Sequence, residues 1–317
     1  SYGALVVENE GRRRVFSNPR EEILLAALLQ VTRQQRKPVG WVVGHGEGAL
    51  DETARSRGYS VARALLVQES TEVRPISLIT DQVPHEVAVL IVAGPQKSFL
   101  PEELANLDRY LQRPGQALFM LDPFRVPDLA AFLRKYDVDL PDDVVLDPNA
   151  RLYGGEHLTM QVSIQRGDHP IIGPLDAPPL FSLTRSVAAA RGEPATSDAV
   201  TFLRTSEESW ATTDSSVVRT GAPRFVAGRD RPGPVGVGME LAFRALTPPG
   251  AEPRQRRLVV YGNSEFANNF FIEFLGNKDL FLNSVNWLAR EQQSLASRPR
   301  TQELGLQQFY LSEEQGN

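Results

Sequence analysis

The stretch KPVGWVVGHGEGAL, from Lys37 to Leu50, contains the pattern from which the fold of the whole chain is predicted. Its apolar run, residues 39–43, stops abruptly at Gly-His-Gly-Glu-Gly, residues 44–48. Many α/β enzymes place a catalytic or phosphate-binding loop directly after a buried strand in this way. The stretch therefore predicts a buried strand that ends in a loop at the edge of a sheet, and this loop is the first candidate for a functional site.

The same pattern occurs three more times along the chain. Apolar runs at 87–93, 117–121 and 258–261 each end in a polar or glycine-containing turn. Amphipathic segments lie between the runs, and one of them begins with Pro-Glu-Glu at 101–103 and continues with leucines at helical spacing. Apolar runs that alternate with helices predict a parallel sheet whose two faces are covered by helices.

Further elements are predicted from the same periodicities. A helix is expected over about 52–68 and a strand over 72–79. After the run at 258–261, aromatic residues fit one buried helical face, and a last helix follows with its own apolar stripe. The residues of these two faces are Phe266, Phe270, Phe271 and Phe274 for the first, and Phe281, Val285 and Leu288 for the second, with Asn277 as the expected cap of the last helix.

The predicted organisation has four parts. Residues 1–36 are expected to form a β-hairpin followed by a helix. Residues 37–140 and 257–292 are expected to form one α/β core, and residues 141–256 an irregular, β-rich insertion ahead of the last core strand, because their strand-like pieces lie among Pro-Gly loops. The polar tail, residues 293–317, is expected to be extended.

Composition excludes several classes of function. The chain has 34 basic and 39 acidic residues, hence a formal charge of −5, and no basic cluster long enough to follow a phosphate backbone, so nucleic acid is not expected as a partner. It has no cysteine, which excludes cysteine nucleophiles, thiolate metal sites and disulfides. Its longest apolar run, Val87–Ala93, is far shorter than the roughly 20 residues that span a bilayer.

The loops after the four core strands form the candidate site. Parallel strands end at the same edge of a sheet, and open α/β sheets bind ligands in the crevice there. We therefore expect the loops to converge on a ligand- or partner-binding crevice. Its candidate residues are Gly44, His45, Gly46, Glu47, Gly94, Gln96, Asp122, Asn263, Ser264 and Glu265.

Each of these residues also has an ordinary structural interpretation. The glycines of 44–48 allow positive φ at a tight turn, and their spacing matches neither a P-loop nor a dinucleotide fingerprint, so phosphate binding is not supported. His45 and Glu47 fit a base and its orienting carboxylate or two metal ligands, but a third ligand is not evident. A loop clamp, in which Glu47 accepts hydrogen bonds from backbone amides, is the favoured alternative. No metal or cofactor is predicted.

The sequence YGNSEF, residues 261–266, matches only half of a nucleophile elbow. The elbow requires G-x-S-x-G, and Phe266 stands where a small residue is needed. Asn263 or Ser264 as a helix N-cap is the ordinary interpretation, and Asp122 before a proline is most simply a turn residue.

Five stretches together resemble a known family. In chain order they are YGALVVENEGRRRVFS, LLAALLQVTRQQRKPVGWVVGHGE, GPQKSFLPEELANLDRYLQRPGQALFMLDP, DHPII and VVYGNSEFANN…GNKDLFLNSVNWLAREQ. They are similar to the gliding-motility-associated ABC transporter auxiliary family, a component of an uncharacterised ABC transport system. The resemblance covers nearly the whole chain, and the pair GHGE and GNxDLFLNxVNWL, about 230 residues apart, is its specific part.

The resemblance implies a fold, a location and partners. The core of the family resembles the flavodoxin-like, class I glutamine amidotransferase-like fold and the GIFT domain of intraflagellar transport, whose members are largely non-catalytic scaffolds. Amidotransferases of that fold use a cysteine nucleophile, which this chain does not have. The family implies a protein outside the cytoplasmic membrane beside an ABC permease and ATPase. Family members are anchored by membrane helices before and after this region, so residues 1–36 are interpreted as the remnant of a longer N-terminal part.

Three hypotheses for function follow. The first is a non-enzymatic extracytoplasmic, periplasmic accessory subunit of an ABC transport system that acts through protein or ligand contact. The second is a module that binds a carbohydrate or another small molecule, with Trp41 and Phe99 as stacking platforms, although both fit equally well as core residues. The third is a hydrolase that uses His45, Glu47 or Ser264. The sequence does not indicate the transported substrate, the permease-binding surface or the oligomeric state.

Overall fold

The structure of the protein is a computed structural model. It describes residues 5–9, 12–16, 38–55, 57–80, 82–113, 115–153, 157–164, 169–190, 197–220, 223–243 and 256–289. The predicted N-terminal hairpin is present, with β1 (Leu5–Asn9) antiparallel to β2 (Arg12–Phe16). The helix predicted after it and the C-terminal tail lie outside the described residues.

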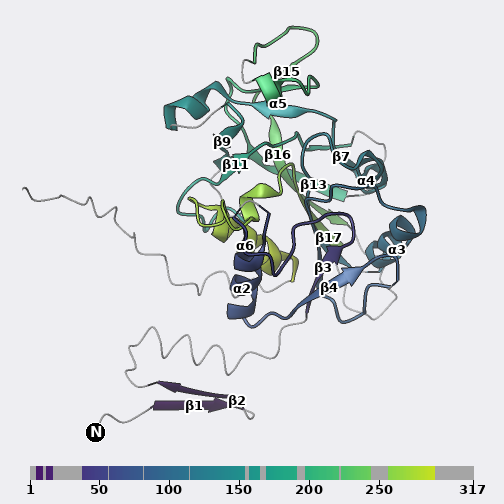
Figure 1. The fold of residues 1–317 in the computed structure, drawn as a ribbon, viewed down its shortest axis with the longest axis vertical. Helices are drawn as coiled ribbons and strands as arrows, with labels where there is room; N and C mark the ends of the chain where they lie inside the picture. The colour runs from purple at the N-terminus through teal and green to yellow at the C-terminus, as the bar shows by residue number, and fades with distance from the viewer. Residues whose placement is uncertain are drawn as a thin grey trace, which may run out of the picture.

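The predicted parallel sheet forms the centre of the molecule (Figure 1). Its parallel strands are β3 (Val39–Val43), β4 (Val73–Ser77), β5 (Val89–Ala93), β6 (Gln116–Met120) and β17 (Arg256–Tyr261). They lie side by side in the order β4-β3-β5-β6-β17, and every neighbouring pair is parallel. Counted along the chain this order is 2-1-3-4-5, which is the order of flavodoxin-like doubly wound sheets.

The segment predicted as an insertion continues this sheet. Antiparallel β16 (Gly236–Phe243), β13 (Ser197–Arg204) and β10 (Ser163–Ile164) follow β17 and complete an eight-stranded sheet. Short strands of this segment also pair outside the central sheet, in one case with a strand that lies just before the segment. These are β9 (Thr159–Gln161) with β11 (Leu180–Ser182), β12 (Ala188–Ala189) with β7 (Val138–Asp139), and the group β8 (Val144–Leu146), β14 (Trp210–Thr212) and β15 (Arg231–Pro232).

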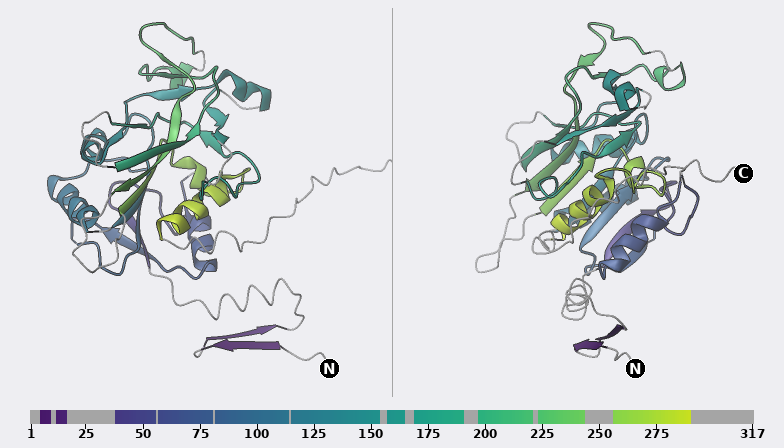
Figure 2. Two further views of the ribbon diagram at one scale, coloured as in Figure 1. Left: turned by 180° about the vertical axis from the view of Figure 1, so that it is seen from behind. Right: turned by 90° about the vertical axis from the view of Figure 1, so that its left-hand side faces the viewer.

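Helices cover both faces of the parallel part (Figure 2). On one face lie α2 (Ser60–Gln68) and α6 (Asn277–Leu288), and on the other α3 (Pro101–Gln112) and α4 (Pro127–Leu133). The remaining helical turns are short: α5 (Val217–Thr220), η1 (Arg134–Tyr136), η2 (Pro148–Tyr153) and η3 (Glu265–Ala267). No helix among the described residues is long and apolar enough to cross a membrane.

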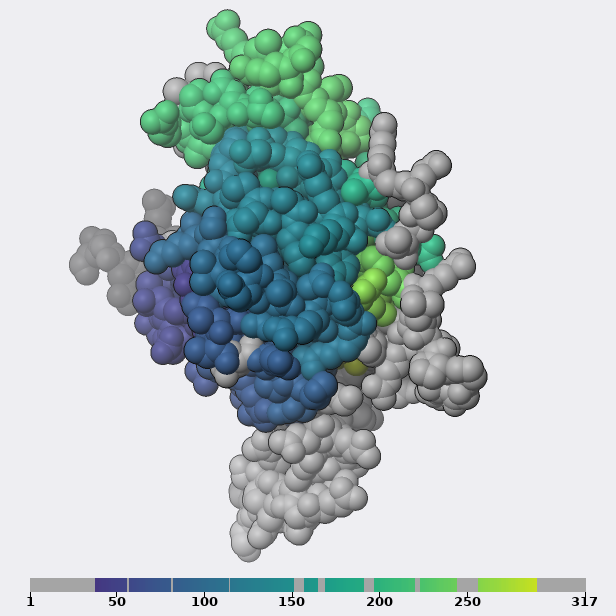
Figure 3. All heavy atoms as spheres, turned by 90° about the vertical axis from the view of Figure 1, so that its right-hand side faces the viewer, coloured from purple at the N-terminus to yellow at the C-terminus, as the bar shows by residue number. Residues whose placement is uncertain are grey.

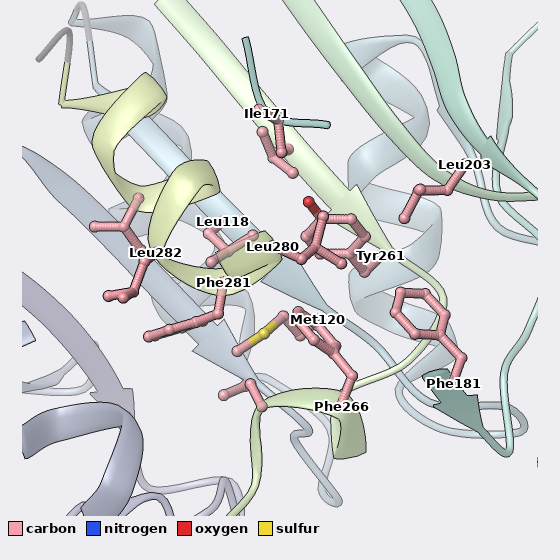
Figure 4. Packing of buried hydrophobic residues seen from close by; sticks show 14 of the residues in the cluster. Leu118, Met120, Ile171, Phe181, Leu203, Tyr261, Phe266, Leu280, Phe281 and Leu282 are labelled. Carbon is pink, nitrogen blue, oxygen red and sulfur yellow. The ribbon is translucent and has the colours of Figure 1, made fainter. Parts of the chain in front are cut away.

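The continuous apolar runs reflect burial on both faces of the sheet. In β5, Ile91 packs towards α2 and α6, whereas its neighbour Leu90 packs towards α3 and α4. Successive strand residues point to opposite faces, so a strand covered on both sides needs apolar residues at every position. Figure 4 shows the first of these two cores, where Phe281 of α6 lies over Met120 of β6.

Two helix predictions are wrong, the first in where the helix begins and the second in that no long helix forms. The helix expected over 52–68 begins only at Ser60, because the carbonyl groups of Glu52 and Gly58 accept hydrogen bonds from Asn269 instead of from a helical turn. The predicted buried helical face at 266–274 does not form either. Its first residue, Phe266, is buried in the short η3, and the chain then continues in turns.

The side chain of Asn268 interrupts the second of these helices. Its Oδ1 accepts the backbone N–H groups of Phe270 and Phe271, both at 2.9 Å, which is a turn that competes with a helix. As a result Phe270 and Phe274 are 39% and 44% exposed, and they pack against each other rather than into the core.

Asn277 is not the cap of the last helix. It is the first residue of α6, and Gly276 occupies the cap position. Its side chain instead pairs with both backbone groups of Leu180, at 2.8 and 2.9 Å, and so joins α6 to β11. The predicted apolar stripe of this helix is confirmed, because Phe281, Val285 and Leu288 are all buried.

Candidate functional site

The four loops meet at the carboxyl edge of the parallel strands, as predicted. The backbone amides of Gln96 and Lys97 donate to the carbonyl oxygen of His45 at 2.7 and 2.9 Å, which joins the first loop to the second. The amide of Ser264 donates to Asp122 Oδ1 at 2.7 Å, which joins the third loop to the fourth. The second of these contacts joins residues that are 142 positions apart in the sequence.

Gly94 connects the two halves of this edge. Its backbone has φ +62°, and a Cβ at this position would lie 2.5 Å from Ser264 Oγ and 3.2 Å from Asp122 Oδ2. Only glycine adopts this conformation without strain and also leaves room for the neighbouring hydroxyl and carboxylate. The close packing of the second loop against the third and fourth therefore depends on the absence of a side chain at this position.

His45 is held in place between two carboxylates. The residue is only 4% exposed, its Nδ1 lies 3.2 Å from Glu47 Oε1, and its Nε2 lies 2.9 Å from Glu103 Oε2. The ring also stacks on Phe99 at 3.9 Å between centroids. The backbone amide of His45 donates to Glu47 Oε2 at 2.6 Å, which confirms the predicted loop clamp.

Each ring nitrogen of His45 faces a carboxyl group. An imidazole donates from both ring nitrogens only when it is protonated; a neutral ring requires one facing carboxyl group to hold the proton. Burial raises the pKa of the Glu47 carboxyl, and hydrogen bonds from its own backbone and from His45 partly oppose this increase. Glu103 also accepts the amide of Leu100 at 2.7 Å, so the cluster is tied to the first turn of α3.

Asp122 and Ser264 form a second cluster at the other end of the edge. The hydroxyl of Ser264 donates to Asp122 Oδ2 at 2.7 Å, in addition to its backbone bond to Oδ1. Burial raises the pKa of Asp122, and the two hydrogen bonds from Ser264 oppose this increase, as do the charges of Arg125 and Arg185. The hydroxyl of Tyr59 donates to the carbonyl of Ser264 at 2.8 Å and closes the cluster from the side of α2.

Glu265 is another carboxyl group of the edge whose pKa is raised. Burial, together with the nearby charge of Asp122, raises its pKa to about 7, and a hydrogen bond with the side chain of Ser182 opposes this increase. The neighbouring Asn263 is buried, and its Oδ1 accepts the amide of Phe266 at 2.8 Å. Asn263, and not Ser264, is therefore the residue whose side chain caps the turn η3.

The remaining predicted site residues lie at the surface of the edge. Gly44, Gly46 and Gln96 are exposed. The side-chain amide of Gln96 folds back onto the carbonyl of Gly94 at 2.9 Å. The ionisable side chains among the predicted site residues are less exposed than these three.

Sequence reasoning missed the part of the site that comes from the middle of the chain. Arg185 is almost fully buried and donates to four backbone carbonyl oxygens, which belong to Asp122, Arg125, Leu140 and Pro141. Burial lowers its pKa. A single arginine between Thr and Ser gives no local signal for this role, since all four acceptors are distant in sequence.

The segment around Arg185 also covers the end of β17. The backbone amide of Arg185 donates to the carbonyl of Gly262 at 2.7 Å, and the Nδ2 of Asn263 donates to the carbonyls of Ser182 and Leu183. Leu183 takes a positive φ of 54°, a conformation that non-glycine residues rarely adopt. The predicted insertion therefore forms one wall of the edge.

An aromatic surface lies directly after the fourth loop. We define this aromatic knob as the exposed residues Phe270, Phe274 and Leu275 together with Phe271, which contacts both phenylalanines. The amide of Asn269 donates to Gly58, which fixes the base of the knob against the loop before α2. Exposed apolar clusters of this kind mark contact sites more often than scattered single residues do.

The geometry limits the chemistry of the edge. Ser264 bonds to Asp122 and His45 bonds to Glu47 and Glu103, so the described residues do not contain the serine–histidine pair that a hydrolase would use. Nor do the described residues include a group of three or more His, Asp or Glu side chains placed to hold a metal ion.

The predicted stacking platform for a carbohydrate is wrong. Trp41 and Phe99 are both buried, the first against Tyr59 and the second against His45. Neither ring offers a face to a ligand at the surface.

Comparison with known proteins places the chain in a family. A family model described as an ABC-type uncharacterized transport system, auxiliary component, matches residues 36–284. Among curated proteins no sequence matches. Solved structures that share features of the fold include the mmIFT52 N-terminal domain, with 14% identity, a TM-score of 0.49, and coverage of 79% of this chain and 96% of that one.

Two further structures are described as putative ThuA-like proteins. The one from Bacteroides uniformis has 13% identity and a TM-score of 0.45, with coverage of 81% of this chain and 92% of that one. The one from Parabacteroides merdae has 12% identity and a TM-score of 0.40, with coverage of 80% and 91%. The family match covers most of the chain and includes all four loops of the edge. The chain therefore belongs to the family of auxiliary components of uncharacterised ABC-type transport systems.

Proposed function

We propose that the protein is a non-enzymatic accessory subunit that binds other components of its transport system through the carboxyl edge of the sheet. The aromatic knob is the observation that supports this proposal. Phe270, Phe274 and Leu275 remain between 39% and 48% exposed, whereas most other large apolar residues that the structure describes are buried. The turn at Asn268 directs them outward, although the same residues at helical spacing would fit a buried face.

The groups beneath the edge support a binding role over a catalytic one. His45 and Ser264 both form hydrogen bonds with carboxyl groups of the same chain, and the guanidinium group of Arg185 donates to backbone carbonyl oxygens. Such contacts give a rigid platform, because each of these three side chains has a partner that fixes its orientation. A rigid platform presents the knob without a large cost in ordering on binding.

The finer assignments are part of the same proposal. By its resemblance to the gliding-motility branch, we expect the protein to lie on the extracytoplasmic, periplasmic side of the membrane, anchored by segments outside this sequence. Its partners would be the permease and the ATPase of the system. The strand order 2-1-3-4-5 is compatible with the proposed relation to the amidotransferase-like and GIFT folds.

A binding measurement with purified permease–ATPase complex in detergent tests the proposal. We expect Phe270→Ser combined with Phe274→Ser to weaken binding at least about tenfold, since exposed aromatic anchors dominate interface energies. Val67→Ser is the control, because Val67 is also exposed but lies in α2, away from the knob in sequence. Equal affinity of the double variant and the unchanged protein would overturn the knob as the contact site.

A second comparison tests the crevice itself. The triple variant His45→Ala, Glu47→Ala and Ser264→Ala removes the side chains that hold the loops. If its circular dichroism spectrum is native and its binding is unchanged, the crevice is not part of the contact, and only the knob remains in the proposal.

A further inference from the structure

A second exposed surface lies away from the carboxyl edge, on the excursion between β14 and β15. We call residues 213–220 and 223–230 the tip. Figure 3 shows this green part of the chain projecting at the top of the molecule. At its end Gly228 has φ +85°, and a Cβ there would meet no atom within 4 Å, so the turn lies in open space. The tip is thus a convex projection.

The tip presents apolar and cationic side chains together. Phe225 is 47% exposed, and Val218 and Val226 of the tip are exposed as well. Phe225 is supported from the body by Trp210, whose ring is perpendicular to it at 6.4 Å between centroids. The hydrogen bonds of the turn, from Val226 N to Asp230 Oδ2 and from Asp230 N to Val226 O, hold the end of the projection in shape.

Only some of the charged residues of the tip form ion pairs. Its two acidic residues, Asp214 and Asp230, both form ion pairs with Arg229. Arg219 and Arg224 are exposed and form no ion pair with any residue that the structure describes. The exposed Glu207 and Glu208 precede β14 and therefore lie at the base of the projection, on the other side of the Trp210–Pro232 pair. The outer end of the tip is cationic, although the chain as a whole has a charge of −5.

This combination fits one kind of surface. A convex end with phenylalanine, valine and unpaired arginine needs no matching cavity when it enters the headgroup region of a bilayer, where apolar side chains are buried and guanidinium groups meet lipid phosphates. The family works with an ABC transport system, so a membrane is within reach of the protein. We propose that the tip docks onto a membrane surface that contains anionic phospholipid. This proposal does not depend on the aromatic knob.

The expected binding is weak and depends on charge. Each arginine near an anionic surface contributes about a fivefold increase in affinity, and salt reduces it. Two unpaired arginines and a few partly buried apolar side chains therefore give binding only at millimolar lipid. This is a contact that orients a protein already held near the membrane rather than one that recruits it.

Vesicle flotation with the full chain tests the proposal. The probes are vesicles of phosphatidylcholine alone and vesicles with about one third phosphatidylglycerol, at low salt. We expect binding to the anionic vesicles only, and a loss of about 25-fold in Arg219→Gln/Arg224→Gln. Phe225→Ser/Val226→Ser should also lose binding, because the apolar contact is removed.

A charge-matched control separates the tip from overall electrostatics. Arg55→Gln/Arg63→Gln removes the same two charges from exposed positions near and within α2. This control should bind anionic vesicles within about twofold of the unchanged protein. Equal loss in both double variants, equal binding to neutral vesicles, or no binding at about 10 mM lipid overturns the proposal. Loss of permease binding in the tip variants without any vesicle binding would mean that an acidic protein surface, not lipid, is the partner.

Discussion

Replacing Glu265 by glutamine should stabilise the protein at alkaline pH and leave its stability unchanged in acid. The pKa of Glu265 is raised from its ordinary value of 4.5 to about 7, first by burial and then by the charge of Asp122. The folded state therefore binds this proton more tightly than the unfolded chain does. The stabilisation is complete below about pH 4.5 and is lost as the pH rises through about 7.

The size of the effect follows from this displacement. A change in pKa from 4.5 to about 7 corresponds to about 3 kcal/mol at 1.36 kcal/mol per pH unit. Because Glu265 is only partly buried, solvent screens part of this energy, and about 1–2 kcal/mol is a realistic gain at pH 8. Glutamine is neutral at every pH and keeps an oxygen that can accept the hydrogen bond from Ser182.

Thermal unfolding at pH 4 and pH 8 is the assay. At pH 8 the Glu265→Gln variant should unfold about 3–6 °C higher than the unchanged protein, and at pH 4 the two should coincide. Glu273→Gln is the control, since Glu273 is exposed in the adjacent turn, and it should change neither value. A Glu265→Gln variant that is less stable at pH 8, or that gains equally at both pH values, would refute the electrostatic reasoning.

Three further predictions concern the contacts of the edge. Arg185→Met should lower the free energy of unfolding, measured in urea, by more than about 3 kcal/mol, because four carbonyl oxygens lose their donor. Full stability in the Arg185→Lys variant would contradict the role of the guanidinium group. Gly94→Ala should lower the free energy of unfolding by about 2–3 kcal/mol. Gly228 also has a positive φ but lies in open space, so Gly228→Ala should lower it by only about 1 kcal/mol. Equal losses in urea titrations would show that crowding by Ser264 is unimportant. Ser264→Ala should lower the free energy of unfolding by about 1–2 kcal/mol, because it removes a hydrogen bond to Asp122. The loss should be larger at pH 8 than at pH 4, since this hydrogen bond favours the charged form of Asp122. A loss that does not depend on pH in thermal scans would argue against this.

The fold of the core was accessible to sequence reasoning for a simple reason. A strand buried on both faces needs apolar residues at every position, and Val89–Ala93 shows such a run without interruption. Once four strands are parallel, their carboxyl ends must lie at one edge, so the meeting of His45 with Gln96 and of Asp122 with Ser264 followed from topology. The loop clamp by Glu47 was also predictable, since it joins residues only two positions apart.

Other features were not predictable because a distant or competing side chain determines them. Helical spacing predicted a buried face at Phe270 and Phe274, but one oxygen of Asn268 captures two backbone amides and turns the chain outward. The start of α2 was misplaced because Asn269 binds the carbonyl of Glu52, more than 200 residues earlier. Arg185 gave no signal, since all of its acceptors come from another part of the sequence.

The sequence by itself determined which segments are buried strands, their succession along the chain, and the family to which they belong, because burial and alternation are recorded locally in every strand. Only the tertiary structure decided which side chains of the edge remain free. Whether His45 is available or clamped depends on Glu103 and Phe99, and the pKa of Glu265 depends on burial and on Asp122. Hydrogen bonds and electrostatic interactions act through space, so residues that are remote in sequence set the chemical state of each group.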